Sequence, residues 1–253
     1  MELDEFLGRY FDGIRAFAAR AGFDERAFSA GFSAGVAAMT GHDGSITNDE
    51  AFWDAFCASA GGERAGWEPT FLRYYETEFA SIGDAVEADP AAARAIRALR
   101  AKGYPLVLAT MPLFPLAAVE KRLAWAGVDP LGFARITRYD NSRAAKPSAA
   151  YYAENLAACG LFGTDVLMVG NSTVDDLAFR NLGAEVYLAT DFLLNPTGAD
   201  VSDVAQGTLA AFADWAEELP ACQNPATGIE QGAVDTAARA AALAANLRAE
   251  RKC

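Results

Sequence analysis

Two adjacent carboxylates, Asp175 and Asp176, stand just beyond a short apolar run at 166–169 and a Gly-Asn-Ser turn. A carboxylate in such a place can bind Mg²⁺, which prefers oxygen ligands. The same pair can instead favour the start of the following helix through the helix dipole. The groups that would work with these carboxylates decide between the two interpretations.

A hydroxyl and an ammonium group complete a possible phosphoryl site. Thr110 follows the apolar run at 105–109, and Lys146 precedes a proline in RAAKPSAAYY. Alone, Thr110 is equally consistent with a turn or cap residue, and Lys146 with a solvated loop residue. Together they can hold a phosphoryl group while a nearby carboxylate holds Mg²⁺. Because ligands bind at the carboxyl ends of parallel strands, the sequence predicts that these groups converge on one rim.

The elements that would position this rim alternate in type. Short apolar runs at 105–109, 134–139, 166–169 and 185–189 predict buried strands. Segments of helical character lie between them, at 116–126, 148–158 and 175–182. This alternation predicts an α/β fold, a Rossmann-like parallel sheet with helices on both faces.

The first hundred residues have a helical rhythm instead. Phe6, Tyr10, Ile14 and Phe17 recur at helical spacing, and Asn48 or Asp49 is expected to cap the helix that carries Phe52. We therefore expect a helical domain at 1–90, an α/β core at 91–225 and a C-terminal helix or tail at 226–253. That last helix could bury Val234, Leu243 and Leu247 against a second copy in a homodimer.

Three ordered segments, VLATMPLFP, RAAKPSAAYY and MVGNSTVDDLAFRNLGAEVYLATD, resemble the second, third and fourth motifs of the haloacid dehalogenase (HAD) superfamily of phosphohydrolases. The resemblance covers about residues 103–195, and the helical segment before it is similar to the helical cap of these enzymes. It implies Mg²⁺-dependent hydrolysis of a small phosphorylated metabolite through a phosphoaspartate. Thr110 would bind the phosphate and Lys146 would steady it, with Met111 and Asn171 beside the substrate. Either Asp175 or Asp176 would bind the metal.

The first motif of that family, Asp-x-Asp-x-Thr, is absent from this sequence. Asp4 and Asp12 cannot replace it, because both lie in an amphipathic helical stretch. In the family the strand of this motif lies between the strands that end here at Thr110 and Gly170. We therefore expect that Met1 is an internal methionine of a longer protein, or that another segment fills the slot, and that the chain as it stands is inactive.

Two further departures from the family keep a second class of function open. Met111 stands where relatives tend to have asparagine, and Gly170-Asn171-Ser172 has fewer carboxylates than the usual acidic motif. A non-catalytic binding or scaffold protein on the same fold is therefore the alternative. A dinucleotide-binding oxidoreductase is disfavoured, because no predicted strand leads into G-x-G-x-x-G.

Composition narrows the range of partners. The 253 residues carry a net charge of −13, which disfavours nucleic acid and anionic membranes. No apolar run is long enough to span a bilayer, and the N-terminus lacks the pattern of a signal peptide. The four cysteines form no CxxC, which favours free thiols in a reducing cytoplasm.

Overall fold

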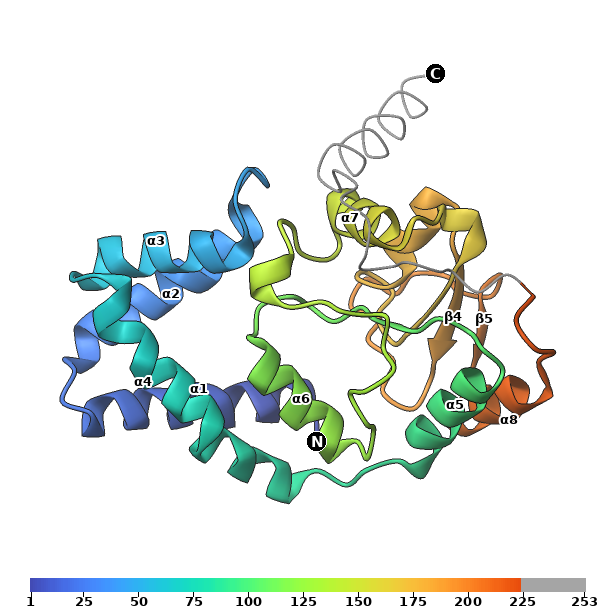
Figure 1. The fold of residues 1–253 in the computed structure, drawn as a ribbon, viewed down its shortest axis with the longest axis horizontal. Helices are drawn as coiled ribbons and strands as arrows, with labels where there is room; N and C mark the ends of the chain where they lie inside the picture. Colours follow the sequence, from blue (N-terminus) through green and yellow to red (C-terminus); the bar gives the residue numbers. More distant parts are fainter. Residues whose placement is uncertain (224–253) are drawn as a thin grey trace. The chain divides into compact units, whose positions relative to one another are not determined.

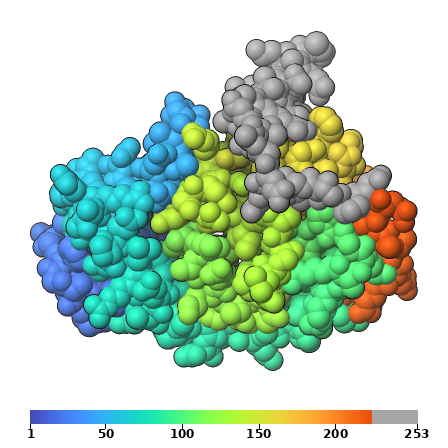
Figure 2. All heavy atoms as spheres, in the orientation of Figure 1, coloured from blue at the N-terminus to red at the C-terminus, as the bar shows by residue number. Residues whose placement is uncertain are grey.

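The computed structural model describes residues 1–223, which are coloured in Figures 1 and 2. They form two units, each built from several stretches of chain. The helical unit contains Met1–Asp89, Pro112–Pro130 and Arg138–Ala144, and the α/β unit contains the remaining described residues. The predicted C-terminal segment, 226–253, and the dimer contacts expected from it lie outside the described residues.

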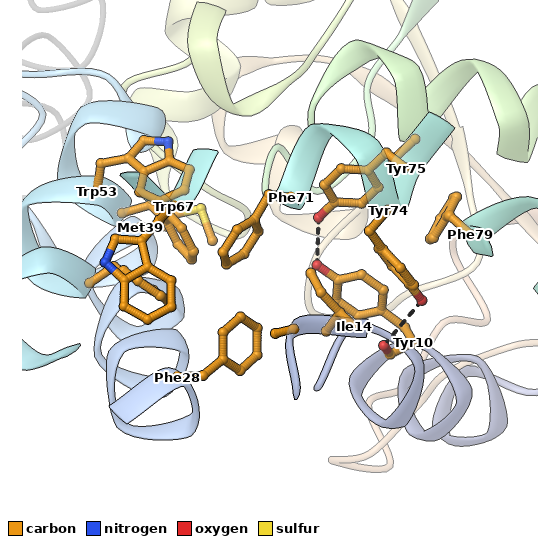
Figure 3. Close-up of a cluster of buried hydrophobic side chains, with 14 of the residues drawn as sticks. Tyr10, Ile14, Phe28, Met39, Trp53, Trp67, Phe71, Tyr74, Tyr75 and Phe79 are labelled. Atoms are coloured by element: carbon orange, nitrogen blue, oxygen red, sulfur yellow. Dashed lines mark hydrogen bonds between the residues drawn. The ribbon is translucent and has the colours of Figure 1, made fainter. Parts of the chain in front are cut away.

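The helical unit is organised around aromatic side chains that recur every third or fourth residue. On α1, Phe6, Tyr10 and Ile14 are buried, as the helical spacing predicted. They pack against rings from the other helices, including Phe71 and Phe79 (Figure 3). The elements of this unit are α1 (Leu3–Arg20), α2 (Glu25–Gly41), α3 (Asn48–Ala60), α4 (Arg64–Glu76), η1 (Glu78–Ala85), α6 (Leu116–Trp125) and η2 (Tyr139–Asn141).

The N-terminus of α3 differs from the expected one. Thr47 is the capping residue, and its hydroxyl accepts a hydrogen bond from the backbone of Glu50, whose carboxylate accepts one from the Thr47 backbone. The prediction that Asn48 or Asp49 caps this helix was therefore wrong. The Asn48 side chain is fully buried, and its amide donates to the carbonyls of Pro112 and Ala144 at 3.1 and 3.3 Å. It thus ties the later segments of the helical unit to α3.

The α/β unit contains parallel strands and the helices that cover them. Its elements are α5 (Pro90–Ala101), β1 (Val107–Leu108), β2 (Arg135–Ile136), α7 (Ala149–Cys159), η3 (Gly163–Asp165), β3 (Leu167–Gly170), η4 (Leu177–Leu182), β4 (Glu185–Ala189), β5 (Ala205–Gly207) and α8 (Leu209–Glu218). Helices α5 and α8 pack side by side through Ala91, Ala95 and Phe212 (Figure 1). The sequence predicted four of the five strands and missed β5, whose residues carry no apolar pattern.

The strands form two separate parallel sheets. β1 pairs with β2, and β3, β4 and β5 pair in that order. Within residues 1–223, β1 and β3 are therefore each paired on one side only, and no strand of this stretch lies between them as a hydrogen-bonded neighbour. The carboxyl ends of these two strands lead to Thr110 and to the turn that follows Gly170.

Candidate functional site

The carboxyl end of β1 is held by a network of hydroxyl groups. The side chain of Thr137, which is fully buried, donates to the carbonyls of Leu108 and Thr110 at 3.1 and 3.0 Å. The phenol of Tyr151, on α7, donates to the same Thr110 carbonyl at 2.7 Å. The Thr110 hydroxyl itself lies 3.3 Å from the Thr137 hydroxyl. These contacts fix the backbone of Thr110 and leave its side chain half-buried at the rim of the α/β unit.

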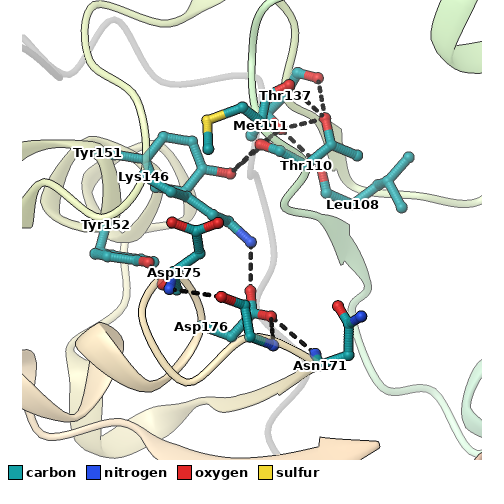
Figure 4. A network of polar contacts seen from close by, with 11 residues as sticks. Leu108, Thr110, Met111, Thr137, Lys146, Tyr151, Tyr152, Asn171, Asp175 and Asp176 are labelled. Carbon is teal, nitrogen blue, oxygen red and sulfur yellow. Dashed lines mark hydrogen bonds and ion pairs between the residues drawn. The ribbon is translucent and has the colours of Figure 1, made fainter. Parts of the chain in front are cut away.

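A buried ion pair joins Lys146 to Asp176 (Figure 4). The ammonium nitrogen lies 2.6 Å from Asp176 Oδ1, and only 8% and 6% of the two side chains are exposed. The same nitrogen lies 5.9 Å from the centre of the Tyr151 ring, within the range of a cation–π contact. Tyr151 thus links the backbone of Thr110, at the end of β1, to the Lys146 ammonium.

The second oxygen of Asp176 is also engaged. Oδ2 accepts hydrogen bonds from the backbone N–H groups of Asn171 and Ser172, each at 2.9 Å. The carboxylate occupies the space beside Gly170, where a Cβ atom would overlap it. Asp176 is therefore a buried anchor that closes the turn after β3 and holds Lys146, because both of its oxygens already have partners.

Asp175 has a different environment from its neighbour. Its backbone is fixed, since its N–H donates to the Ser172 hydroxyl at 2.9 Å and its carbonyl accepts from the Tyr152 phenol. Its side-chain carboxylate makes no hydrogen bond or ion pair with any described residue. Partial burial raises the pKa of Asp175, the adjacent Asp176 raises it further, and Lys146 opposes the shift. Asp175 is thus the carboxylate of the pair with free ligand capacity.

The side chains of two other predicted site residues, Asn171 and Met111, do not contact Lys146 or the aspartate pair through a hydrogen bond or ion pair within residues 1–223. The Asn171 side-chain amide donates to the Phe192 carbonyl at 2.6 Å, which fixes the loop after β4. The half-buried Met111 follows Thr110 and makes no side-chain hydrogen bond among residues 1–223. Of the predicted residues, Lys146 and Asp176 contact each other directly, the Asn171 backbone bonds Asp176, and Thr110 is reached through Tyr151 (Figure 4).

Thr137 and Tyr151 were missed by sequence reasoning. The signal that could have found Thr137 is its place after β2, which makes it the parallel neighbour of the β1 end. For Tyr151, the signal is its position one helical turn after the cap residue Ser148, close to Lys146 in sequence. Sequence analysis had placed them only within the predicted strand at 134–139 and the predicted helix at 148–158.

The donor set for a metal ion is small. Within residues 1–223, no three His, Cys, Asp or Glu side chains cluster in a way that could hold a metal. Mg²⁺, however, is usually held by one or two carboxylates together with water and substrate phosphate oxygens. The unengaged Asp175 carboxylate fits that requirement as a single protein ligand, whereas Asp176 does not unless its ion pair opens.

The α/β unit thus combines parallel strands with a buried lysine–carboxylate pair near the ends of β1 and β3, and comparison with known families shows the class to which it belongs. The sequence model described as haloacid dehalogenase-like hydrolase matches residues 9–183. The chain therefore belongs to the haloacid dehalogenase-like hydrolases.

Comparisons with solved structures and with curated proteins do not extend this assignment beyond the family. One similar solved structure is described as a predicted phosphoglycolate phosphatase from Haemophilus somnus 129PT. It shares 19% identity with this chain, covers 80% of this chain and 88% of its own, and has a TM-score of 0.46. No curated protein matched. Among residues 1–223, no helix combines the length and apolar character that crossing a bilayer requires.

Proposed function

We propose that this chain is a phosphohydrolase that acts on monoesters of a small phosphorylated metabolite. The observation that supports the proposal is the buried Lys146–Asp176 ion pair, which the Tyr151 ring links to the end of β1 at Thr110. Membership of a hydrolase family supports the reaction class. The net charge of −13 favours a small-molecule partner over nucleic acid or an anionic membrane. The free thiols of Cys57, Cys159 and Cys222 favour a reducing cytoplasm.

Each residue has a separate role in this proposal. The Thr110 hydroxyl donates to a phosphoryl oxygen, and the Lys146 ammonium offsets the phosphoryl charge. Asp176 is a positioning residue, because it holds Lys146 and closes the turn. Asp175 is the protein ligand of Mg²⁺, which supplies further charge neutralisation when bound. The choice between the two aspartates thus falls on Asp175 for the metal.

No residue of this sequence is assigned as the nucleophile. Phosphoaspartate chemistry needs a carboxylate in line with the phosphorus, and this sequence contains no Asp-x-Asp pair. In this proposal Asp175 binds the metal and Asp176 holds Lys146, so neither is the nucleophile. We therefore expect almost no turnover from the 253-residue chain alone.

The second candidate is a non-catalytic protein that binds a phosphorylated ligand or acts as a scaffold. Two observations favour it over an active enzyme, namely the missing Asp-x-Asp pair and the neutralisation of Lys146 by Asp176. A phosphate group could still bind, because the contacts of the Thr110 hydroxyl are long, at 3.3–3.4 Å, and the Asp175 carboxylate has no partner among the described residues.

One experiment separates the candidates. Hydrolysis of 4-nitrophenyl phosphate with Mg²⁺ is measured for the chain and for a version that carries an added N-terminal apolar strand ending in Asp-x-Asp-x-Thr. Turnover that appears only in the extended version, and that Lys146→Met in this version abolishes, supports the enzyme. Silence of both versions, with inorganic phosphate still bound in calorimetry, supports the binding protein. Absence of phosphate binding in both would overturn the shared anion site.

A further inference from the structure

The helical unit contains a partly open cavity of about 230 Å³ to which the proposed reaction assigns no role. Its walls come from α1, α2, α3 and α4 and from the later segments of the same unit. Most of the lining side chains are aromatic or aliphatic, among them Trp53, Phe71 and Tyr75 (Figure 3). An unfilled space of this size forfeits dispersion contacts along its whole lining, and well-packed interiors contain few of them.

The size of the cavity limits what can occupy it. An apolar cavity of about 150 Å³ is large enough to bind one benzene ring. By proportion, this cavity admits a fused two-ring molecule of about ten non-hydrogen atoms. Water is a poor filling, because a buried water needs two to four polar partners and most of this lining is apolar.

Charge excludes a phosphorylated occupant. No Lys, Arg or His side chain is among the described residues that line the cavity. Glu68 is the single charged lining residue, and its carboxylate is already bound by Arg64 at 2.6 and 3.0 Å. An anionic group would lose its hydration without gaining a cation. The occupant is therefore uncharged, unlike the phosphorylated ligand proposed for the α/β unit.

The phenol hydroxyls of tyrosine residues are hydrogen-bonding groups in the otherwise apolar lining. The hydroxyls of Tyr10 and Tyr75 lie 2.6 Å apart and share one hydrogen bond, so one hydroxyl hydrogen of the pair is left to donate elsewhere. Burial raises the pKa of both phenols, so that they stay protonated even well above neutral pH. Tyr139 adds a third phenol to the lining, and its hydroxyl makes no hydrogen bond with a described residue, although its backbone N–H donates to the Phe114 carbonyl.

Two lining residues also reach the solvent. Phe11 is 39% exposed and Leu72 is 41% exposed, although both contribute to the cavity wall. Large apolar side chains in this state mark a place where the cavity approaches the surface of the helical unit. A ligand could enter there without unfolding a helix.

We infer that the helical unit binds an uncharged, flat, two-ring molecule in this cavity, with a hydrogen-bond acceptor directed at the phenols of Tyr10 and Tyr75. The surrounding rings supply the offset and edge-on contacts that aromatic ligands prefer. The phenols supply orientation, as the few polar groups of an apolar pocket commonly do. The inference does not depend on turnover at the phosphoryl site.

The test uses the full chain and two probes of the same shape. Quinoline carries a ring nitrogen that accepts a hydrogen bond at neutral pH, and naphthalene does not. Binding is followed by titration of the ligand NMR signals, with 2-naphthyl phosphate as the charged comparison. We expect saturable binding of quinoline at one site, weaker binding of naphthalene, and no effect of 2-naphthyl phosphate on the quinoline signals. The inference would be overturned if neither quinoline nor naphthalene showed saturable binding.

Matched variants locate the binding. Val36 lines the cavity on α2, and Ala37 is the next residue and faces solvent. We expect Val36→Phe to weaken quinoline binding by about tenfold or more, because the new ring fills the space, and Ala37→Phe to leave it unchanged. Leu113→Phe serves as a second filling variant if Val36→Phe does not fold. Tyr75→Phe should reduce the preference for quinoline over naphthalene. Equal binding by the filling variants and Ala37→Phe would place the ligand elsewhere and refute the inference.

Discussion

The phenol of Tyr151 donates a hydrogen bond of 2.7 Å to the carbonyl of Thr110, across forty residues of sequence. This contact joins α7 to the end of β1 and places an aromatic ring beside the Lys146 ammonium. The candidate site therefore depends on a side chain that touches no proposed ligand.

Removal of that phenol should weaken both the fold and the site. We expect Tyr151→Phe to lower the free energy of unfolding by about 1 kcal/mol, the usual loss for one buried hydrogen bond. Inorganic phosphate should also bind more weakly, because Thr110 loses a restraint. Urea unfolding and calorimetry measure the two effects. Tyr187→Phe is the matched control, since its exposed phenol bonds the Thr208 carbonyl at a longer 3.3 Å. Equal losses in the two variants would contradict a special role for Tyr151.

The Lys146–Asp176 pair should be costly to break from one side. Lys146→Met leaves a buried carboxylate without its cation, and we expect a loss of about 3–5 kcal/mol in the free energy of unfolding. Arg180→Met removes an exposed pair with Asp203, in which 46% and 66% of the side chains are accessible. The expected loss there is below about 1 kcal/mol. Urea unfolding of both variants checks the contrast, which similar losses would refute.

Gly170 should tolerate no side chain. The Cβ of Gly170→Ala would overlap the Asp176 carboxylate, so either the turn or the ion pair must move. We expect a loss of about 1–3 kcal/mol and a fall in phosphate affinity. Gly8→Ala on α1 meets no neighbouring atom and should stabilise the protein by about 0.5–1 kcal/mol. A neutral Gly170→Ala in thermal and urea unfolding would show that the close approach is not needed.

Asp175 should make stability depend on pH and on Mg²⁺. Because burial and Asp176 raise its pKa in the folded state, stability is fully present below the ordinary value of 3.8 and is lost as pH rises through the raised pKa. Asp175→Asn lacks this loss, so its advantage over the parent in urea unfolding should grow from acid toward neutral pH. Mg²⁺ should stabilise the parent and not the variant.

The control for that prediction is Asp84→Asn. Asp84 is exposed on η1, so its replacement should leave the response to Mg²⁺ unchanged. If Mg²⁺ stabilises Asp175→Asn as strongly as the parent, the assignment of the metal to Asp175 is wrong.

Periodic patterns in the sequence predicted most of the fold. The aromatic residues of α1 gave its buried face, and the apolar run at 185–189 gave β4. Such patterns are informative because a helix or strand that buries one face repeats its apolar residues at a fixed spacing in the sequence. The cap of α3 was predicted wrongly, because Asn48 is engaged by the distant carbonyls of Pro112 and Ala144. Contacts of that kind leave no local trace in the sequence.

The candidate site was predicted in part for the same reason. Strand ends pointed to Thr110, Lys146 and the aspartate pair, but the sequence alone could not separate Asp175 from Asp176. The distinction depends on which carboxylate faces the turn amides, and a one-residue shift reverses it. The supporting residues Thr137 and Tyr151 were hidden, because a buried threonine or tyrosine is usual in a strand or helix that packs in a core.

The helical unit is not continuous in sequence, and this has a practical consequence for dissecting the protein. The chain passes between the two units five times, at 89/90, 111/112, 130/131, 137/138 and 144/145. A fragment that stops at Asp89 would lack Leu113, Phe114 and Tyr139, and so part of the wall of the aromatic cavity. Neither unit can be isolated by a single cut; each would have to be rejoined through new connections.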